Sequence, residues 1–412
     1  MSRAKRTLSA AIGPGILVAA TGVGAGDLAT AALTGTRLGI AILWAVVVGA
    51  LVKFVLNEGL ARWQLATGET LLEGATSRLG RPAQYIFLAY LIAWSFMVAA
   101  ALMSAAGVAA HALLPLADEA STGKIVYGIL LSLFGLVMVR VGGYRLFEKV
   151  MSVCIGVMFV TVVVTAILLK PALAPLLKGL VWPSIPDLHG NGLTWTMALM
   201  GGVGGTVTVL CYGYWIREEG RHDTEDLTAC RIDLGIAYGM TALFGIAMVV
   251  IGSTIEIDGR GATLVTKLGN RLAEELGTFG KWAFLLGAFG AIFSSLLGVW
   301  QSVPYLFCDL WGMIRARSGE RPAVSTDSAA YRWFLYALAI VPMVGLWIGF
   351  ARMQKTYAIF GAVFMPMLAL VLLLLNSRAA WIGERFRNRP LTSVFLVLIL
   401  LFFVGAGYLA IT

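Results

Sequence analysis

The chain consists mainly of apolar segments that are long enough to cross a lipid bilayer. Hydrophobic residues make up 59% of its 412 residues and charged residues 13%, against about 25% charged residues in a typical soluble domain. About 20 apolar helical residues span a bilayer, and in lipid a helix satisfies its own backbone. The sequence therefore predicts an all-α polytopic membrane protein, with a further surface helix at 263–276. The predicted spans are 11–35, 41–62, 83–115, 124–141, 150–170, 192–216, 231–252, 280–310, 331–350, 355–376 and 391–411.

Basic residues divide unequally between the two sets of connections. With the N-terminus placed in the cytoplasm, 19 Lys and Arg lie on the cytoplasmic side and 10 on the outer side. Cytoplasmic loops of membrane proteins carry the excess of Lys and Arg. We therefore expect a cytoplasmic N-terminus, an outer C-terminus, and an inner or plasma membrane location. The net charge of +9 follows from this bias, so the expected partner is the lipid bilayer and not a nucleic acid.

Two of the apolar segments are interrupted by clusters of glycine. The first cluster is Gly22-Val23-Gly24-Ala25-Gly26 and the second is Gly201-Gly202-Val203-Gly204-Gly205. In lipid, backbone freed from a helix must face a cavity or a ligand, and paired interruptions in two halves point to a transporter's binding site. Because each half has five helices, the second repeat is inverted relative to the first. We predict one transporter domain over 1–412, with repeats at about 11–170 and 192–376 and an extra helix at 391–411.

Several stretches of the chain resemble the Nramp family of divalent-metal transporters. The resemblance implies the LeuT-type fold, with two inverted five-helix repeats, an eleventh helix, and breaks in helices 1 and 6. It covers nearly the whole chain and is carried by Gly13-Pro14-Gly15-Ile16-Leu17, by Gly35, Gly39 and Leu43-Trp44, by Gly68-Glu69, by Gly143-Tyr144-Arg145-Leu146-Phe147-Glu148 and by Leu176-Leu177-Lys178-Gly179-Leu180.

The metal-binding motifs of that family are replaced in this chain. The family's Asp-Pro-Gly-Asn of helix 1 falls on Gly24-Ala25-Gly26-Asp27, and its Met-Pro-His of helix 6 falls on Thr208-Val209-Leu210. A thioether ligand favours softer transition metals, whereas Mg²⁺ prefers oxygen. The resemblance therefore implies an all-oxygen metal site made by Asp27, Thr208, backbone carbonyls and water, with Mg²⁺ favoured over Mn²⁺. Nramp-related magnesium transporters also depart from the family's pattern.

The family's route for protons is missing as well. Nramp proteins use acidic residues in helix 3, whereas the predicted helix at 83–115 contains no Asp or Glu. The helix 6 histidine is also replaced. We expect weak or absent proton coupling.

The charge of the predicted site depends on Asp27 and Lys53, and two interpretations of each are open. Asp27 either contacts the cargo, as buried intramembrane carboxylates often do, or caps the start of its own half-helix. Lys53 either extends its ammonium to the membrane interface or pairs with Asp27 or Glu58. If it neutralises Asp27, a small organic or zwitterionic solute becomes the alternative cargo.

The remaining candidates follow from their positions near the breaks or in charged sequence. Glu58 and Arg62 have the i, i+4 spacing of a helical ion pair. Neither a catalytic constellation nor an ATP-binding loop is present, so we expect neither an enzyme nor an ATP-driven pump, and no cofactor. The predicted substrate contacts are Gly24, Ala25, Gly26, Asp27, Gly205, Thr208, Val209, Leu210 and Tyr212. The predicted gating or coupling residues are Lys53, Asn57, Glu58, Arg217 and Glu218.

Overall fold

The computed structural model describes residues 23–142, 145–188, 190–256, 261–316 and 325–409. Every regular element in these ranges is a helix, which confirms the predicted all-α class. The longer helices are α3 (Ala31–Leu38), α4 (Leu43–Thr67), α5 (Leu71–Leu79), α6 (Arg81–Leu113), α7 (Ala120–Val141), α8 (Arg145–Leu168), α9 (Leu173–Val181), α10 (Gly192–Gly202), α11 (Cys211–Glu218), α12 (Leu227–Gly252), α13 (Leu264–Arg315), α14 (Ala329–Ile340), α15 (Phe350–Asn376), α16 (Ala379–Ile382) and α17 (Pro390–Leu409). The shorter ones are η2 (Val23–Thr30), η3 (Gly39–Ile42), η4 (Val207–Leu210), η5 (Thr224–Asp226), η6 (Val341–Trp347) and η7 (Glu384–Phe386).

The membrane-spanning helices occur in the predicted order. Nine stretches among the described residues are long and apolar enough to cross a membrane. One of them, Gly26–Thr67, is a single run of 42 residues that contains the end of the first predicted span and the whole of the second. Residues 11–22 of the first predicted span lie outside the described residues. The shorter apolar helix Ser152–Leu168 corresponds to the fifth predicted span. The chain is thus a multi-pass membrane protein. The limits of its two repeats stay a prediction.

Some boundaries differ from the predicted ones for local reasons. The surface helix expected at 263–276 and the span expected at 280–310 form one element, α13, bent at Gly277. Gly277 has a φ of 66°, a region that glycine enters without steric cost. The span expected at 331–350 changes from α14 into the tighter helix η6, where Pro342 lies at the start and cannot donate a backbone hydrogen bond.

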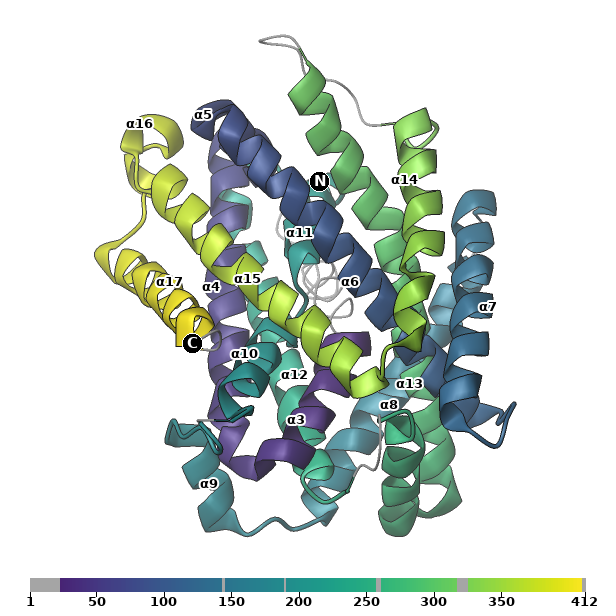
Figure 1. Cartoon of the computed structure of the whole chain (residues 1–412). Helices are drawn as coiled ribbons and strands as arrows, with labels where there is room; N and C mark the ends of the chain where they lie inside the picture. The colour runs from purple at the N-terminus through teal and green to yellow at the C-terminus, as the bar shows by residue number, and fades with distance from the viewer. Residues whose placement is uncertain (1–22, 143–144, 189, 257–260, 317–324, 410–412) are drawn as a thin grey trace, which may run out of the picture.

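α10 and α11, the helices on either side of the second glycine cluster, lie near the centre of the molecule (Figure 1). α15 and α6 cross in front of α10, α11 and α3, while α17 lies outside against α15. α5 and α16 mark one end of the molecule, and α9 and the end of α3 mark the other. Under the predicted topology, the α5 end faces the cytoplasm.

Glycine allows the central helices to approach one another closely. A Cβ atom added to Gly26 would lie 2.1 Å from the carbonyl oxygen of Gly202, so the two interrupted segments touch backbone to backbone. The same holds for α3 and α12, where a Cβ on Gly35 would lie 2.3 Å from the carbonyl oxygen of Val249. Small residues commonly permit such contacts between membrane helices. Packing therefore accounts for part of the glycine content that the sequence shows.

A methyl group at position 26 is expected to disturb the centre of the protein. In Gly26→Ala the added carbon would overlap the Gly202 carbonyl, and overpacking of this kind costs about 1–3 kcal/mol. We expect a lower melting temperature of the detergent-purified protein. The matched control is Gly239→Ala in α12, where an added Cβ meets nothing within 4 Å. Equal melting temperatures for the two variants would contradict this packing.

Candidate functional site

The first predicted break is a widened stretch of helix. Residues Val23–Thr30 form a π-helix that continues into α3. Single π-helical turns inside longer helices are frequent at functional sites. Gly22 lies outside the described residues, and for Gly24 and Ala25 only the backbone, within η2, is described.

The second predicted break is confirmed as an interruption between two helices. α10 ends at Gly202, and regular helix resumes only with η4 at Val207 and then α11. Gly204 and Gly205 have φ values of 75° and 84°. These values lie in the left-handed region that side chains with a Cβ rarely adopt. The glycine cluster therefore encodes this interruption directly.

Asp27 and Lys53 bind the backbone groups that the interruption frees. One carboxylate oxygen of Asp27 accepts a hydrogen bond from the Gly204 N–H at 2.7 Å. The Lys53 ammonium donates to the carbonyl oxygen of Gly201 at 2.9 Å, and also to those of Val203 and Gly205. Both side chains are fully buried and attract each other electrostatically. One acidic and one basic side chain thus bind the interrupted backbone.

These contacts exclude one of the two open interpretations of each residue. Lys53 does not extend to the membrane interface, because its side chain has no exposed surface. The carboxylate of Asp27 does not cap its own half-helix; its bonded oxygen, Oδ1, takes the N–H of Gly204 in the other broken segment. Its second oxygen, Oδ2, is buried and has no hydrogen-bond partner among the described residues. Asp27 therefore retains one oxygen that can bind a ligand.

Further oxygen atoms surround the interruption. The amide nitrogen of Asn57 donates to the hydroxyl of Tyr238 at 3.0 Å, while the amide oxygen of Asn57 is buried without a partner in the described part of the chain. The ring of Tyr238 packs beside Gly204. Tyr357 of α15 is buried and interacts with Thr206 in the interruption. Because most buried polar atoms in proteins are satisfied, the unpaired oxygens of Asp27 and Asn57 mark a place for a cation or a hydrogen-bond donor.

A metal at this place would depend on few charged ligands. Within the described ranges, no group of three or more His, Cys, Asp or Glu lies close enough to hold a metal ion. Asp27 is the one carboxylate among the predicted substrate contacts. Thr208 and Val209, which the sequence places at the site, are buried residues of η4. The unpaired atoms of Asp27 and Asn57 are both oxygens, Oδ2 and Oδ1 respectively. The metal site made by Asp27 and Thr208 stays a prediction.

Among the described residues, Glu58 forms ion pairs with two arginines and not with Lys53. The predicted pair with Arg62 is confirmed at 3.3 Å, and a second pair with Arg231 measures 2.7 Å. Arg62 also donates to the carbonyl oxygen of Phe386 at 3.0 Å. Glu58 therefore links α4 to α12, and Arg62 extends the link to η7.

The predicted gating residues Arg217 and Glu218 differ in their contacts. Arg217 lies 3.4 Å from the carboxylate of Glu73 on α5 and 3.2 Å from the carbonyl oxygen of Gly68, while Glu218 is exposed. The ion pair of Arg217 with Glu73 therefore joins α11 to α5, and the gating role of Arg217 and Glu218 stays a prediction.

Tyr212 belongs to a buried polar cluster with two residues that the sequence did not single out. Its hydroxyl donates to the carboxylate of Asp233 at 3.2 Å, and Arg221 lies 3.3 Å from the same carboxylate. All three side chains are buried. An acid placed three residues inside a predicted span was the available signal for Asp233. Tyr212 therefore anchors α11 to α12.

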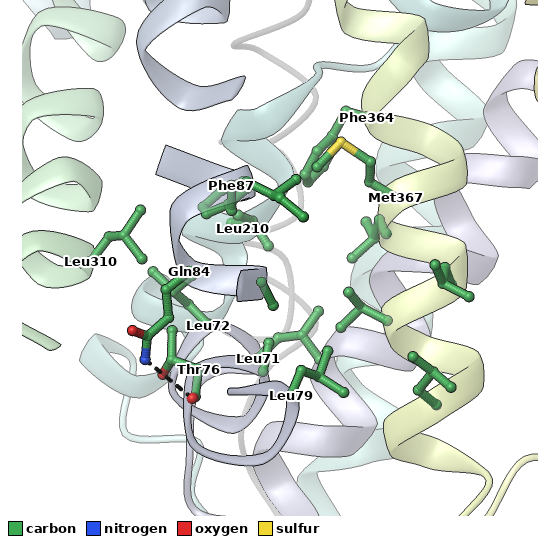
Figure 2. Close-up of a pocket in the computed structure, with 17 residues that line it drawn as sticks. Leu71, Leu72, Thr76, Leu79, Gln84, Phe87, Leu210, Leu310, Phe364 and Met367 are labelled. Atoms are coloured by element: carbon green, nitrogen blue, oxygen red, sulfur yellow. Dashed lines mark hydrogen bonds between the residues drawn. The ribbon is translucent and has the colours of Figure 1, made fainter. Parts of the chain in front are cut away.

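Leu210 reaches an apolar cavity between α5, α6 and α15, shown in Figure 2. The cavity has a volume of about 430 Å³. Phe87, Phe364 and Met367 line the cavity together with Leu210, and Gln84 donates to the Thr76 carbonyl at 3.2 Å. Its lining contains no charged side chain. This cavity is unsuited to a metal ion.

A polar cavity of about 770 Å³ lies at the opposite end of the molecule. Its lining includes three basic residues, Arg37, Arg352 and Lys355, but one acidic residue, Asp187. The ammonium of Lys355 donates to the side chain of Asn191 at 3.0 Å. Under the predicted topology this cavity is the outer vestibule, and its charge is positive.

Comparison with known proteins identifies the family. Residues 15–412 match the family described as Nramp, natural resistance-associated macrophage protein-like. A divalent metal cation transporter, MntH of Klebsiella pneumoniae, is 30% identical over 187 residues, which cover 45% of this chain and 44% of that relative. The chain thus matches less than half the length of this curated relative.

Solved structures show the same fold. The manganese transporter of Eremococcus coleocola has a TM-score of 0.73 at 18% identity, covering 99% of this chain and 87% of that one. MhsT, a LeuT-fold protein solved in complex with L-phenylalanine, has a TM-score of 0.64 at 14% identity, covering 96% and 98%. The expected LeuT-type fold is confirmed. This membrane protein belongs to the Nramp family of transporters.

Proposed function

We propose that this chain is a secondary transporter that carries a divalent metal cation by alternating access between the two sides of the membrane. The observation that carries the proposal is the buried, unpaired Oδ2 atom of Asp27, beside the interruption of the sixth span. Membership of the Nramp family supports it, as do the names of the relatives, which include divalent metal and manganese transporters. The cation would lie between η2 and the Gly202–Val207 segment.

The donor atoms favour a hard cation. Thr208 takes the place of the family's methionine, and the available ligands are oxygens of Asp27, Asn57 and the backbone. Mg²⁺ binds through one or two carboxylates and keeps several waters, which suits a site with one carboxylate. We propose Mg²⁺ ahead of Mn²⁺, with weak or absent coupling to protons because α6 has no Asp or Glu. The N-terminus is proposed to be cytoplasmic and the C-terminus outside.

The direct test is uptake of Mg²⁺ and Mn²⁺ into proteoliposomes that contain a divalent-sensitive dye. We expect saturable uptake of both ions, with a lower half-saturating concentration for Mg²⁺, and little change when a pH gradient is imposed. Vesicles without protein provide the baseline. Uptake no faster than this baseline for either ion would contradict the proposal.

A second candidate cargo is a small zwitterionic solute. Two observations favour it: the buried ammonium of Lys53 and the carboxylate of Asp27 attract each other, and the cavity at the predicted outer end is lined by three basic residues and one acidic residue. Here the unpaired oxygen of Asp27 would accept a hydrogen bond from the ammonium group of the solute. A panel of labelled amino acids in the same vesicles tests this candidate.

Charge reversal in the vestibule separates the two candidates. Arg352→Glu replaces a positive charge on the predicted entry path, so divalent cations should accumulate there and enter about two- to threefold faster at low ionic strength. The effect should disappear at high salt, where such charges are screened. The matched control is Arg332→Gln, an exposed arginine at the start of α14. Slower divalent uptake by Arg352→Glu would contradict a cationic cargo.

A further inference from the structure

The ammonium of Lys53 has an unusual environment for a charged group inside a membrane protein. Lys53 lies in α4 with no exposed surface. Its three N–H groups meet the carbonyl oxygens of Gly201, Val203 and Gly205. A lysine ammonium has three donors and no acceptor, so the number of carbonyls matches the number of donors.

These carbonyls have the arrangement by which broken helices hold small cations. In transporters with discontinuous helices, unwound carbonyls and the C-terminal ends of half-helices coordinate Na⁺ or H⁺. Gly201 belongs to the last turn of α10, where the helix dipole concentrates negative charge. Val203 and Gly205 lie in the interruption itself. A charge inside the membrane is costly and is retained where it has a function.

We propose that the carbonyls of Gly201, Val203 and Gly205 form a site for a monovalent cation, which the chain fills with its own Lys53 ammonium. The tethered ammonium takes the place of a free Na⁺ or K⁺ ion. The transport cycle therefore needs no monovalent co-substrate, and the interrupted backbone keeps its shape without one. This inference concerns the backbone cage and holds for either cargo considered above.

Lys53 could instead serve ordinary helix packing. Two substitutions of Lys53 distinguish packing from a cation site. Packing alone requires the volume of the side chain, which methionine also provides. A cation site requires a positive charge, which a free ion can supply if the side chain is shortened. Lys53→Ala opens the cage to ions, whereas Lys53→Met fills most of the space without a charge.

The experiment measures the melting temperature of the detergent-purified full chain in NaCl, KCl or choline chloride at equal ionic strength. We expect Lys53→Ala to be less stable than wild type in choline, and to gain about 2 °C or more, saturably, in Na⁺ or K⁺. Wild type and Lys53→Met should show no such gain. The matched control is Lys124→Ala, which removes another buried lysine whose ammonium donates to the Ile348 carbonyl at 2.7 Å, and which should not respond to either ion.

Two results would overturn the proposal. One is a folded Lys53→Ala that responds to Na⁺ and K⁺ no more than wild type does. The other is a Lys53→Met as stable as wild type, because three buried carbonyls would then need no cation. If Lys53→Ala yields no folded protein in any salt, the melting temperature of Lys53→Met still tests the proposal. Neither readout involves transport, so failure of the proposed cargo would leave this test intact.

Discussion

Asp27→Asn should lower the initial rate of divalent cation uptake at least about 100-fold. The substituted amide can still accept the hydrogen bond from Gly204 N–H through its oxygen, so the interruption of the sixth span is preserved. What is lost is the negative charge. At an effective dielectric constant of 20, two unit charges 4 Å apart interact by about 4 kcal/mol, and a divalent ion would lose still more. Uptake into proteoliposomes measures the effect.

Two further variants test whether the loss of uptake comes from the charge at position 27. Asp118→Asn removes an exposed acid from the loop between α6 and α7 and should leave uptake unchanged. Asp27→Ala removes both the charge and the acceptor for Gly204, so it should also lower the melting temperature, since breaking a buried pair costs about 3–5 kcal/mol. Uptake by Asp27→Asn at the wild-type rate would rule out Asp27 as the cation ligand.

Lys53→Met should change uptake in the opposite direction. Lys53 attracts Asp27 and repels any cation that approaches it. Removing this repulsion should lower the half-saturating concentration of the divalent cation about tenfold or more, by the same Coulomb estimate. The variant should also melt at a lower temperature, because three carbonyls lose their donor.

Lys53→Arg is the control, since it keeps the positive charge and should keep the weaker affinity. An unchanged or higher half-saturating concentration in Lys53→Met would show that Lys53 does not set the charge of the site. Loss of uptake of a zwitterionic solute in the same variant would favour the second candidate cargo.

The sequence was sufficient for the fold because the fold depends on local signals. Apolar length gives the spans, and Gly204 and Gly205 adopt the positive φ angles that interrupt the sixth span. The merged helix α13 escaped prediction because the bend at Gly277 is a single residue within otherwise helical sequence. The π-helical form of η2 was also missed, since no residue type encodes it.

The site was only partly predictable because its contacts join distant parts of the chain. Asp27 and Gly204 are 177 residues apart, and Lys53 lies about 150 residues from its carbonyl partners. The sequence identifies the charged residues, but not which backbone groups they bind. The same holds for Tyr212, where the acid that fixes its hydroxyl lies in the next span.

The central claim is that a divalent cation binds between the two interrupted segments, and anomalous X-ray scattering from crystals grown with Mn²⁺ tests it most directly. The account predicts an anomalous peak about 2.0–2.4 Å from the Oδ2 atom of Asp27, absent from crystals of Asp27→Asn. A peak confined to the vestibule lined by Asp187, or none at all in the wild type, would contradict it.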